Sequence, residues 1–276
     1  MQLKAFIQRH AIAAYFVLAF AISWGTSLVT MGPKFFGGVP LERLGDALPS
    51  LIGMMLGPFL SGILLTWIVD GPSGVRTLFT RMRRWKVGGQ WWLAALLLFP
   101  AVLMIVLLLL TRVRSSYFVP GFAFIGIPYG LLAGWFEETG WTGFATPRMQ
   151  MKFGALATGL LLGFIHGIWH ILADYMGSSG AFGVYWFTHF AAMWLVGLMA
   201  LRVITIWIYN RTRSLLLAQL THASFTGCLI TLTPTPIDPA NETTWYLAFA
   251  VAIWLVATIV IVTSHWRLAK PVAAAA

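Results

Sequence analysis

The 276-residue sequence predicts an all-α polytopic membrane protein with about eight transmembrane helices around a polar intramembrane cavity. Apolar residues make up 59% of the chain and charged residues only 9%, whereas soluble domains have about 25% charged residues. Uncharged runs of about 20 residues, each long enough to cross a bilayer as a helix, recur from end to end. Because these runs leave no room for a soluble segment, we expect one integral membrane domain over 1–276.

Each expected helix is an apolar run bounded by Lys, Arg, Pro or Gly. The first follows Lys4 and Arg9 and continues to Gly32, which is too long for the apolar region of a signal peptide, so we expect an uncleaved helix. The third ends just before Arg112 and the fourth just before Arg148. In chain order the expected spans are 11–32, 47–69, 91–111, 122–147, 154–175, 183–209, 214–233 and 244–264.

The distribution of basic residues predicts the orientation. With the N-terminus in the cytoplasm, 13 of the 18 Lys and Arg lie on that side and four lie outside. The positive-inside rule then places both termini and the loop from Asp70 to Gln90 in the cytoplasm, with the plasma membrane as the expected location. Arg202, the remaining one, lies within the sixth helix, and we expect it to snorkel to the cytoplasmic end.

The basic segment Arg76 to Lys86 is interpreted as a topology signal that also attracts anionic lipid. We therefore expect membrane lipids as partners, and no nucleic acid.

Ionisable residues inside the apolar runs are the candidates for chemistry. Six of the eight acidic residues lie in loops or at span ends, but Glu137 and Glu138 lie inside the fourth span. Each ionised carboxylate there costs about 2.5–3.5 kcal/mol on insertion scales, so we expect a functional reason for the pair. Four histidines also fall within expected spans: His166, His170, His189 and His222. His189 is near the outer end of its helix, where we expect it to be interfacial.

Helical spacing separates the two glutamates. Glu138 and Thr142 are four residues apart and share a face, whereas Glu137 points about 100° away. The two carboxylates are therefore expected to have different roles. The same spacing places His166 on the face of His170, and Thr226 on the face of His222.

A carboxylate beside two imidazoles can activate water, because Glu accepts a proton while His orients the water or protonates a leaving amine. A second His with a hydroxyl can stabilise an oxyanion. His and Glu are also zinc ligands, but the segment from His166 to His170 lacks the Glu of an H-E-x-x-H motif. We expect no cofactor. A metal ion bound by Glu and His stays as an alternative. Cys228 is expected to be a small core hydrophobe.

Three ordered segments carry a family resemblance: Glu137-Glu138-Thr139-Gly140-Trp141-Thr142, His166-Gly167-Ile168-Trp169-His170, and His222-Ala223-Ser224-Phe225-Thr226. They resemble the E-E-x-x-x-R motif, the aromatic-x-x-x-His motif and the His-x-x-x-Asn motif of the CAAX protease and bacteriocin-processing (CPBP, or Abi) family. This is a family of glutamic intramembrane endopeptidases.

The resemblance implies that Glu137 is the base that activates water, with His170 beside it, and that His222 helps to stabilise the oxyanion. In the family pattern an Arg steadies the second glutamate, but this sequence has Thr142 at that position. We therefore expect Glu138 to be neutral or to pair with Arg148. His166 replaces the aromatic residue and Thr226 replaces the Asn, so both are candidate orienting or oxyanion residues.

The sequence thus favours an intramembrane endopeptidase, with a cavity open to the cytoplasm, that cleaves a membrane-associated peptide with or without a prenyl group. One alternative is a non-catalytic immunity or scaffold protein with a degenerate protease site. A proton-coupled transporter is the other, although the sequence shows no internal repeat of the kind that transporters have.

Overall fold

The computed structural model describes residues 2–39, 47–236 and 238–268, and every regular element within these ranges is a helix. The α-helices are α1 (Gln2–Arg9), α2 (Ala11–Thr30), α3 (Gly32–Phe36), α4 (Ala47–Met82), α5 (Gly89–Val113), α6 (Gly126–Gly140), α7 (Thr146–Phe153), α8 (Ala155–Phe182), α9 (Trp186–Phe190), α10 (Leu198–Thr212), α11 (Leu215–Leu232) and α12 (Pro239–Thr263). Two 3-10 turns, η1 (Ser116–Phe118) and η3 (Gly183–Tyr185), and two π-helical turns, η2 (Trp141–Ala145) and η4 (Ala191–Gly197), connect some of them.

Six helical segments in the described residues are long and apolar enough to cross a membrane, which confirms the all-α polytopic class. One of the six, Ala155–Thr212, contains two expected spans, which are separated at Gly183, where φ is 51°. The expected span 122–147 is not among the six; in the structure α6 covers 15 residues of it before η2 begins.

The expected loop after Asp70 is wrong over 72–82, where α4 is helical again. Gly71 has φ 71°, so the helix bends there and resumes at Pro72. The resumed part buries Leu78 and Met82 against Leu215 on α11, so it packs on the bundle instead of forming a loop.

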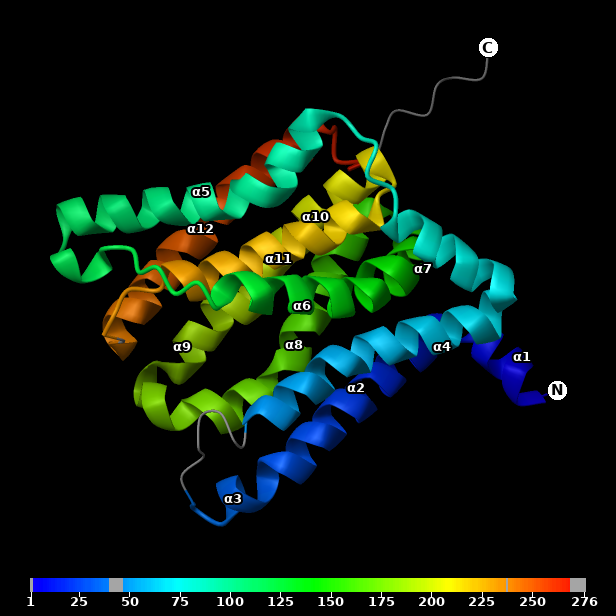
Figure 1. The fold of residues 1–276 in the computed structure, drawn as a ribbon, viewed down its shortest axis with the longest axis horizontal. Coiled ribbons are helices and arrows are strands. Elements are labelled where there is room, and N and C mark those ends of the chain that lie inside the picture. The colour runs from blue at the N-terminus through cyan, green and yellow to red at the C-terminus, as the bar shows by residue number, and fades with distance from the viewer. Residues whose placement is uncertain (1, 40–46, 237, 269–276) are drawn as a thin grey trace.

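The helices run back and forth between two ends of the bundle (Figure 1). The terminal end holds α1, α7 and the last turn of α12, and the opposite end holds α3, η1 and η3. Helices α6 and α11 lie side by side in the middle, with α2 and α4 along one flank and α5 and α12 along the other.

Close backbone contact between α6 and α11 positions the glutamate pair. A Cβ atom added to Gly130 would lie 2.4 Å from the carbonyl oxygen of Ala223, and one added to Gly134 would lie 2.2 Å from that of Gln219. Small residues at helix interfaces allow such close approach in membranes. Gly130 and Gly134 therefore allow the last turn of α6 to lie next to the part of α11 that carries His222.

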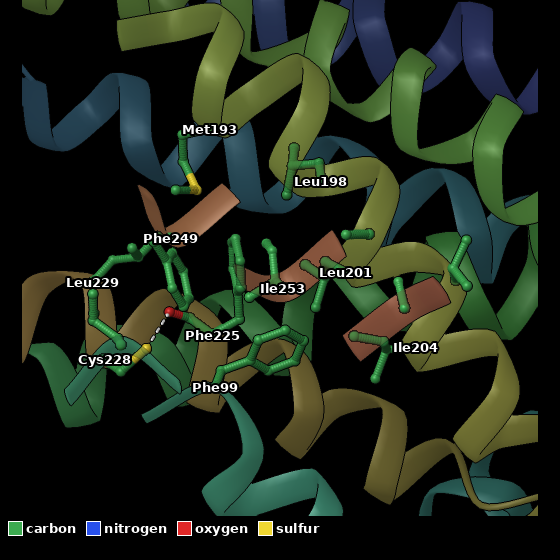
Figure 2. Close-up of a cluster of buried hydrophobic side chains, with 14 of the residues drawn as sticks. Phe99, Met193, Leu198, Leu201, Ile204, Phe225, Cys228, Leu229, Phe249 and Ile253 are labelled. Carbon is green, nitrogen blue, oxygen red and sulfur yellow. Dashed lines mark hydrogen bonds between the residues drawn. The ribbon is translucent and has the colours of Figure 1, made fainter. Parts of the chain in front are cut away.

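A second packed region lies between α5, α10, α11 and α12 (Figure 2). Phe99, Phe225 and Phe249 pack there with aliphatic side chains, and Cys228 is buried at its edge, with its thiol directed at the carbonyl oxygen of Phe225. The expectation that Cys228 is a core residue is confirmed.

We predict that Gly134→Ala lowers stability by about 1–3 kcal/mol, the usual cost of overpacking, because the added methyl group meets backbone and not a movable side chain. Thermal unfolding in detergent measures the effect. Gly25→Ala is the matched control, since nothing lies within 4 Å of a Cβ atom there. Equal unfolding temperatures for the two variants would contradict the packing described.

Candidate active site

Helices α6, α8, α10 and α11 bring their ionisable side chains together in one buried cluster. Glu137 and Glu138 lie in the last turn of α6, with exposed fractions of 5% and 0%. His166 comes from α8, Arg202 from α10 and His222 from α11.

Glu138 is the most heavily hydrogen-bonded member of the cluster. The guanidinium of Arg202 binds both of its carboxylate oxygens, with Nη2 2.6 Å from Oε1 and Nη1 2.8 Å from Oε2. The Nδ1 atom of His222 lies 2.6 Å from Oε1, and the Thr142 hydroxyl donates to Oε2. Four contacts use the acceptor capacity of an ionised carboxylate, so the geometry is that of a buried carboxylate locked between three helices.

Arg202 corrects two expectations. It is fully buried and does not snorkel to the terminal end. It also gives Glu138 a partner that is neither of the expected alternatives, since Arg148 instead pairs with Asp70. The guanidinium that the family pattern places at the Thr142 position therefore comes from another helix. In the sequence, this pair is indicated by one Arg deep in an apolar run and two acidic residues deep in another.

Arg202 also sets the tautomer of His166. Its Nη2 and Nε atoms lie 3.0 and 3.3 Å from His166 Nδ1, and a guanidinium only donates. Nδ1 must therefore be the lone-pair nitrogen, so Nε2 carries the hydrogen and donates to Glu137 Oε2 at 2.9 Å. The indole of Trp141 also points at Oε2, at 3.4 Å, whereas Oε1 of Glu137 receives no hydrogen bond from the described residues.

Glu137, His166 and His170 have donor atoms within 4.8 Å of one another, a spacing that a metal ion requires. A metal ligand must offer a lone pair, however, and the His166 nitrogen that faces Glu137 carries a hydrogen in this arrangement. The hydrogen bonds thus favour a donor role for His166 over metal coordination.

His222 lies between the two glutamates. With Nδ1 on Glu138, its Nε2 is 3.9 Å from Glu137 Oε2. Thr226, one turn further along α11, is half-buried and takes no part in the hydrogen bonds of the cluster. The structure therefore brings six of the seven expected site residues together and leaves Thr226 beside them.

His170 makes no hydrogen bond among the described residues, and ring contacts alone hold it. Its imidazole stacks on the indole of Trp194, from η4, with centroids 4.0 Å apart and planes 23° apart. The Trp194 Nε1 atom donates to Asp174 Oδ2 at 3.0 Å. Asp174, one turn beyond His170 on α8, also accepts hydrogen bonds from Trp186 and Ser178. Neither Trp194 nor Asp174 was among the site residues predicted from the sequence.

A cavity of about 240 Å³ reaches the cluster from the opposite end of the bundle. Glu137 and His170 lie on its wall together with Trp194 and Asp174, and Ser50 and Ser178 line it further out. Most of the remaining lining is apolar. Since His170 has free nitrogens and Glu137 a free oxygen at this wall, water or a peptide in the cavity can contact both.

His189 corrects another expectation, because it is buried and not interfacial. Its ring stacks on Phe182 at 4.1 Å and packs on Tyr246 at 4.2 Å. Glu242, in the first turn of α12, is also buried and lies 3.7 Å from His189 Nε2. This pair is separate from the cluster around Glu138.

Residues 119–228 match the protein-family model described as type II CAAX prenyl endopeptidase Rce1-like. The matched segment contains all three motifs and Arg202, so the resemblance to CAAX proteases is confirmed over this part of the chain. The match supports a CAAX protease-type intramembrane endopeptidase in general. No curated protein matches the sequence.

We predict that Arg202→Met lowers stability by about 3–5 kcal/mol, because Glu138 is left as an uncompensated buried charge. Thr142→Arg alone should also destabilise, since it adds a second guanidinium to a carboxylate that is already neutralised. The double variant Arg202→Met with Thr142→Arg should recover part of the loss, because residue 142 is one turn from Glu138. Thermal unfolding measures the stability of all three variants. A double variant less stable than both single variants would show that an Arg at position 142 does not replace Arg202 as the partner of Glu138.

We predict that Asp174→Asn and Trp194→Leu loosen the His170 ring, so that turnover falls by roughly 10-fold or more with little change in KM. Trp194→Phe keeps an aromatic ring under His170 and should be milder. Trp186→Phe is the matched control, because Trp186 contacts Asp174 but makes no ring contact with His170. NMR of ring-labelled histidine measures His170 mobility independently of turnover. An unchanged His170 signal in Trp194→Leu would refute the role of Trp194 in holding the His170 ring.

Proposed function

We propose that this protein is a glutamic intramembrane endopeptidase that hydrolyses a peptide bond with water activated by Glu137. The observation that carries the proposal is that the two glutamate carboxylates differ in their hydrogen bonds and in their access to the cavity. Glu138 is saturated with donors, whereas Glu137 keeps a free oxygen at the cavity wall beside His170. A general base needs such an accessible oxygen within reach of its water.

In the proposed reaction a water molecule in the cavity gives a proton to Glu137 as its oxygen attacks the peptide carbonyl carbon. His170 lies on the cavity wall, and a ring N–H there can donate to the developing oxyanion. His222 lies beside Glu137, with Nε2 3.9 Å from Oε2; because its Nδ1 donates to Glu138, Nε2 can donate as well only when both ring nitrogens carry hydrogen. Glu137 then gives the proton to the amine as the carbon–nitrogen bond breaks. Cys228 is buried in a separate core, away from Glu137, so the proposed reaction has no covalent intermediate on a thiol.

Hydrogen bonds fix Glu137 for this role. His166 and Trp141 donate to its Oε2, which orients the carboxyl group and leaves Oε1 for water. Glu138 acts through His222 and Arg202, and is a positioning residue. We propose that neither the attack of water on the carbonyl carbon nor the protonation of the amine requires a metal ion.

The substrate is proposed to be a peptide or protein segment held at the membrane. The family description names prenylated CAAX substrates, and a prenyl group is one means of holding a peptide there. The apolar wall around Met54 and Met55 suits a short apolar stretch of peptide.

Thr226 favours a second candidate, a non-catalytic membrane scaffold or immunity protein with a degenerate site. The family pattern has an Asn donor at this position, and loss of one oxyanion donor can slow an enzyme by about 10²–10³. Among the residues that the structure describes, the Thr226 side chain makes no hydrogen bond that would replace it.

We predict that Glu137→Gln lowers turnover by roughly 10² or more with nearly unchanged folding, because the amide keeps the side-chain volume but lacks basicity. Glu138→Gln should act mainly on stability, since it disturbs the Arg202 pair. Purified protein assayed with plain and prenylated peptide libraries, with and without chelator, supplies the measurement. Equal turnover in wild type and Glu137→Gln would reject the glutamic mechanism and favour the scaffold.

A further inference from the structure

We propose that a basic hollow at the terminal end of the bundle binds the phosphate headgroup of an anionic phospholipid. The hollow has a volume of about 840 Å³, and residues of α1, α2, α4 and α7 line it together with Gly143 of η2. Helices α1 and α7 mark this end in Figure 1. Because none of the described site residues lines the hollow, the inference goes beyond the proposed function and does not depend on it.

The hollow carries an excess of positive charge. Its described lining includes one acidic residue, Asp70, and four basic ones, which are Arg9, Arg81, Arg148 and Lys152. Asp70 pairs with Arg148, whereas Arg9 and Lys152 are exposed and form no ion pair with any described residue. Four positive charges against one negative charge leave an excess of three. The complementary ligand is therefore an anion.

Two of the basic side chains are held in place before any ligand binds. Arg81 Nη1 donates to the Tyr209 hydroxyl at 2.7 Å, and Arg81 Nη2 donates to the carbonyl oxygen of Gly143 at 2.8 Å. The Arg148 guanidinium lies over the ring of Phe144 and donates to the carbonyl oxygen of that residue at 2.9 Å. A guanidinium has five N–H donors, so each keeps donors for a ligand beyond these contacts. Fixed guanidinium groups with spare donors match the oxygens of a phosphate.

The position of the hollow favours a lipid headgroup over a soluble anion. Ala11, on its wall, begins a helix that is apolar enough to cross a membrane, and Asp70 lies directly before the bend of α4 at Gly71. The hollow therefore lies at the depth where spans begin and phospholipid headgroups are found. Met151 and Phe153 also line it, with exposed fractions of 82% and 42%, so they can contact the acyl chains of the same lipid. The predicted orientation places this end at the cytoplasmic leaflet, whose anionic lipids attract basic residues.

A headgroup bound in the hollow would act on the turn beside the catalytic cluster. The carbonyl oxygens that Arg81 and Arg148 hold both belong to η2. The same turn carries Thr142, whose hydroxyl donates to Glu138. Because a bound phosphate would keep both guanidinium groups in place, we expect it to stabilise η2 and, through η2, the arrangement of the site.

Lipid titration of the purified full chain in a neutral detergent tests the proposal without any assay of turnover. The probes are dioctanoyl phosphatidylglycerol, dioctanoyl phosphatidylcholine and inorganic phosphate, and binding is measured by native mass spectrometry and by thermal unfolding. The test variant is Arg9→Gln with Lys152→Gln, because both side chains are exposed and form no ion pair that folding needs. The matched control is Arg83→Gln with Lys86→Gln, which removes the same charges from exposed positions outside the hollow, just after α4. In both pairs the Lys lies over the ring of a neighbouring aromatic residue.

We expect phosphatidylglycerol to bind the wild type saturably and to raise its unfolding temperature more than phosphatidylcholine or inorganic phosphate does. The test variant should bind phosphatidylglycerol roughly 10-fold or more weakly, because it loses two cations near the headgroup, and the control should stay within about 2-fold of the wild type. Equal weakening in the two double variants would show a general attraction by surface charge and would overturn the proposal. Inorganic phosphate that binds as tightly as phosphatidylglycerol would assign the hollow to a soluble anion, and a wild type that does not bind phosphatidylglycerol would leave it without a lipid; either result also rejects the proposal.

Discussion

A carboxylate at the centre of an apolar bundle must be neutralised by the protein itself, because lipid offers it no partner. Glu138 meets this requirement with the guanidinium of Arg202, the imidazole of His222 and the hydroxyl of Thr142. These contacts tie α6 to α10 and α11 through one side chain. Together with the close Gly contacts between α6 and α11, this ion pair fixes the relative placement of the three helices and the positions of Glu137 and His222.

The same guanidinium links the structural glutamate to the catalytic candidate. Because Arg202 donates to His166 Nδ1, the other nitrogen of that ring must donate to Glu137, and only one oxygen of Glu137 is left for water. His170 is held differently, by stacking on Trp194. Both π-helical turns contribute here, with Trp141 and Thr142 on η2 and Trp194 on η4, and such turns often occur at functional sites.

Much of the fold could be predicted from the sequence, because hydrophobic runs and their basic boundaries follow directly from the chemistry of the bilayer. The π-helical turns and the helix after Gly71 could not, since apolar periodicity does not report a local change of helical pitch. At the site, helical spacing separated Glu137 from Glu138 correctly. The Arg202 pair spans 64 residues, and its partner position carries an ordinary Thr, so local motif reading looked for the cation on the wrong helix.

A local i, i+4 ion pair would be complete as soon as its own helix formed. Here Glu138 is synthesised long before Arg202, so α6 enters the membrane with a carboxylate that has no cation. Insertion of the first half of the protein therefore carries an electrostatic cost that only the arrival of α10 removes. The order of synthesis therefore couples assembly of the site to completion of the bundle, because the Glu138 carboxylate gains its cation only when α10 is in place.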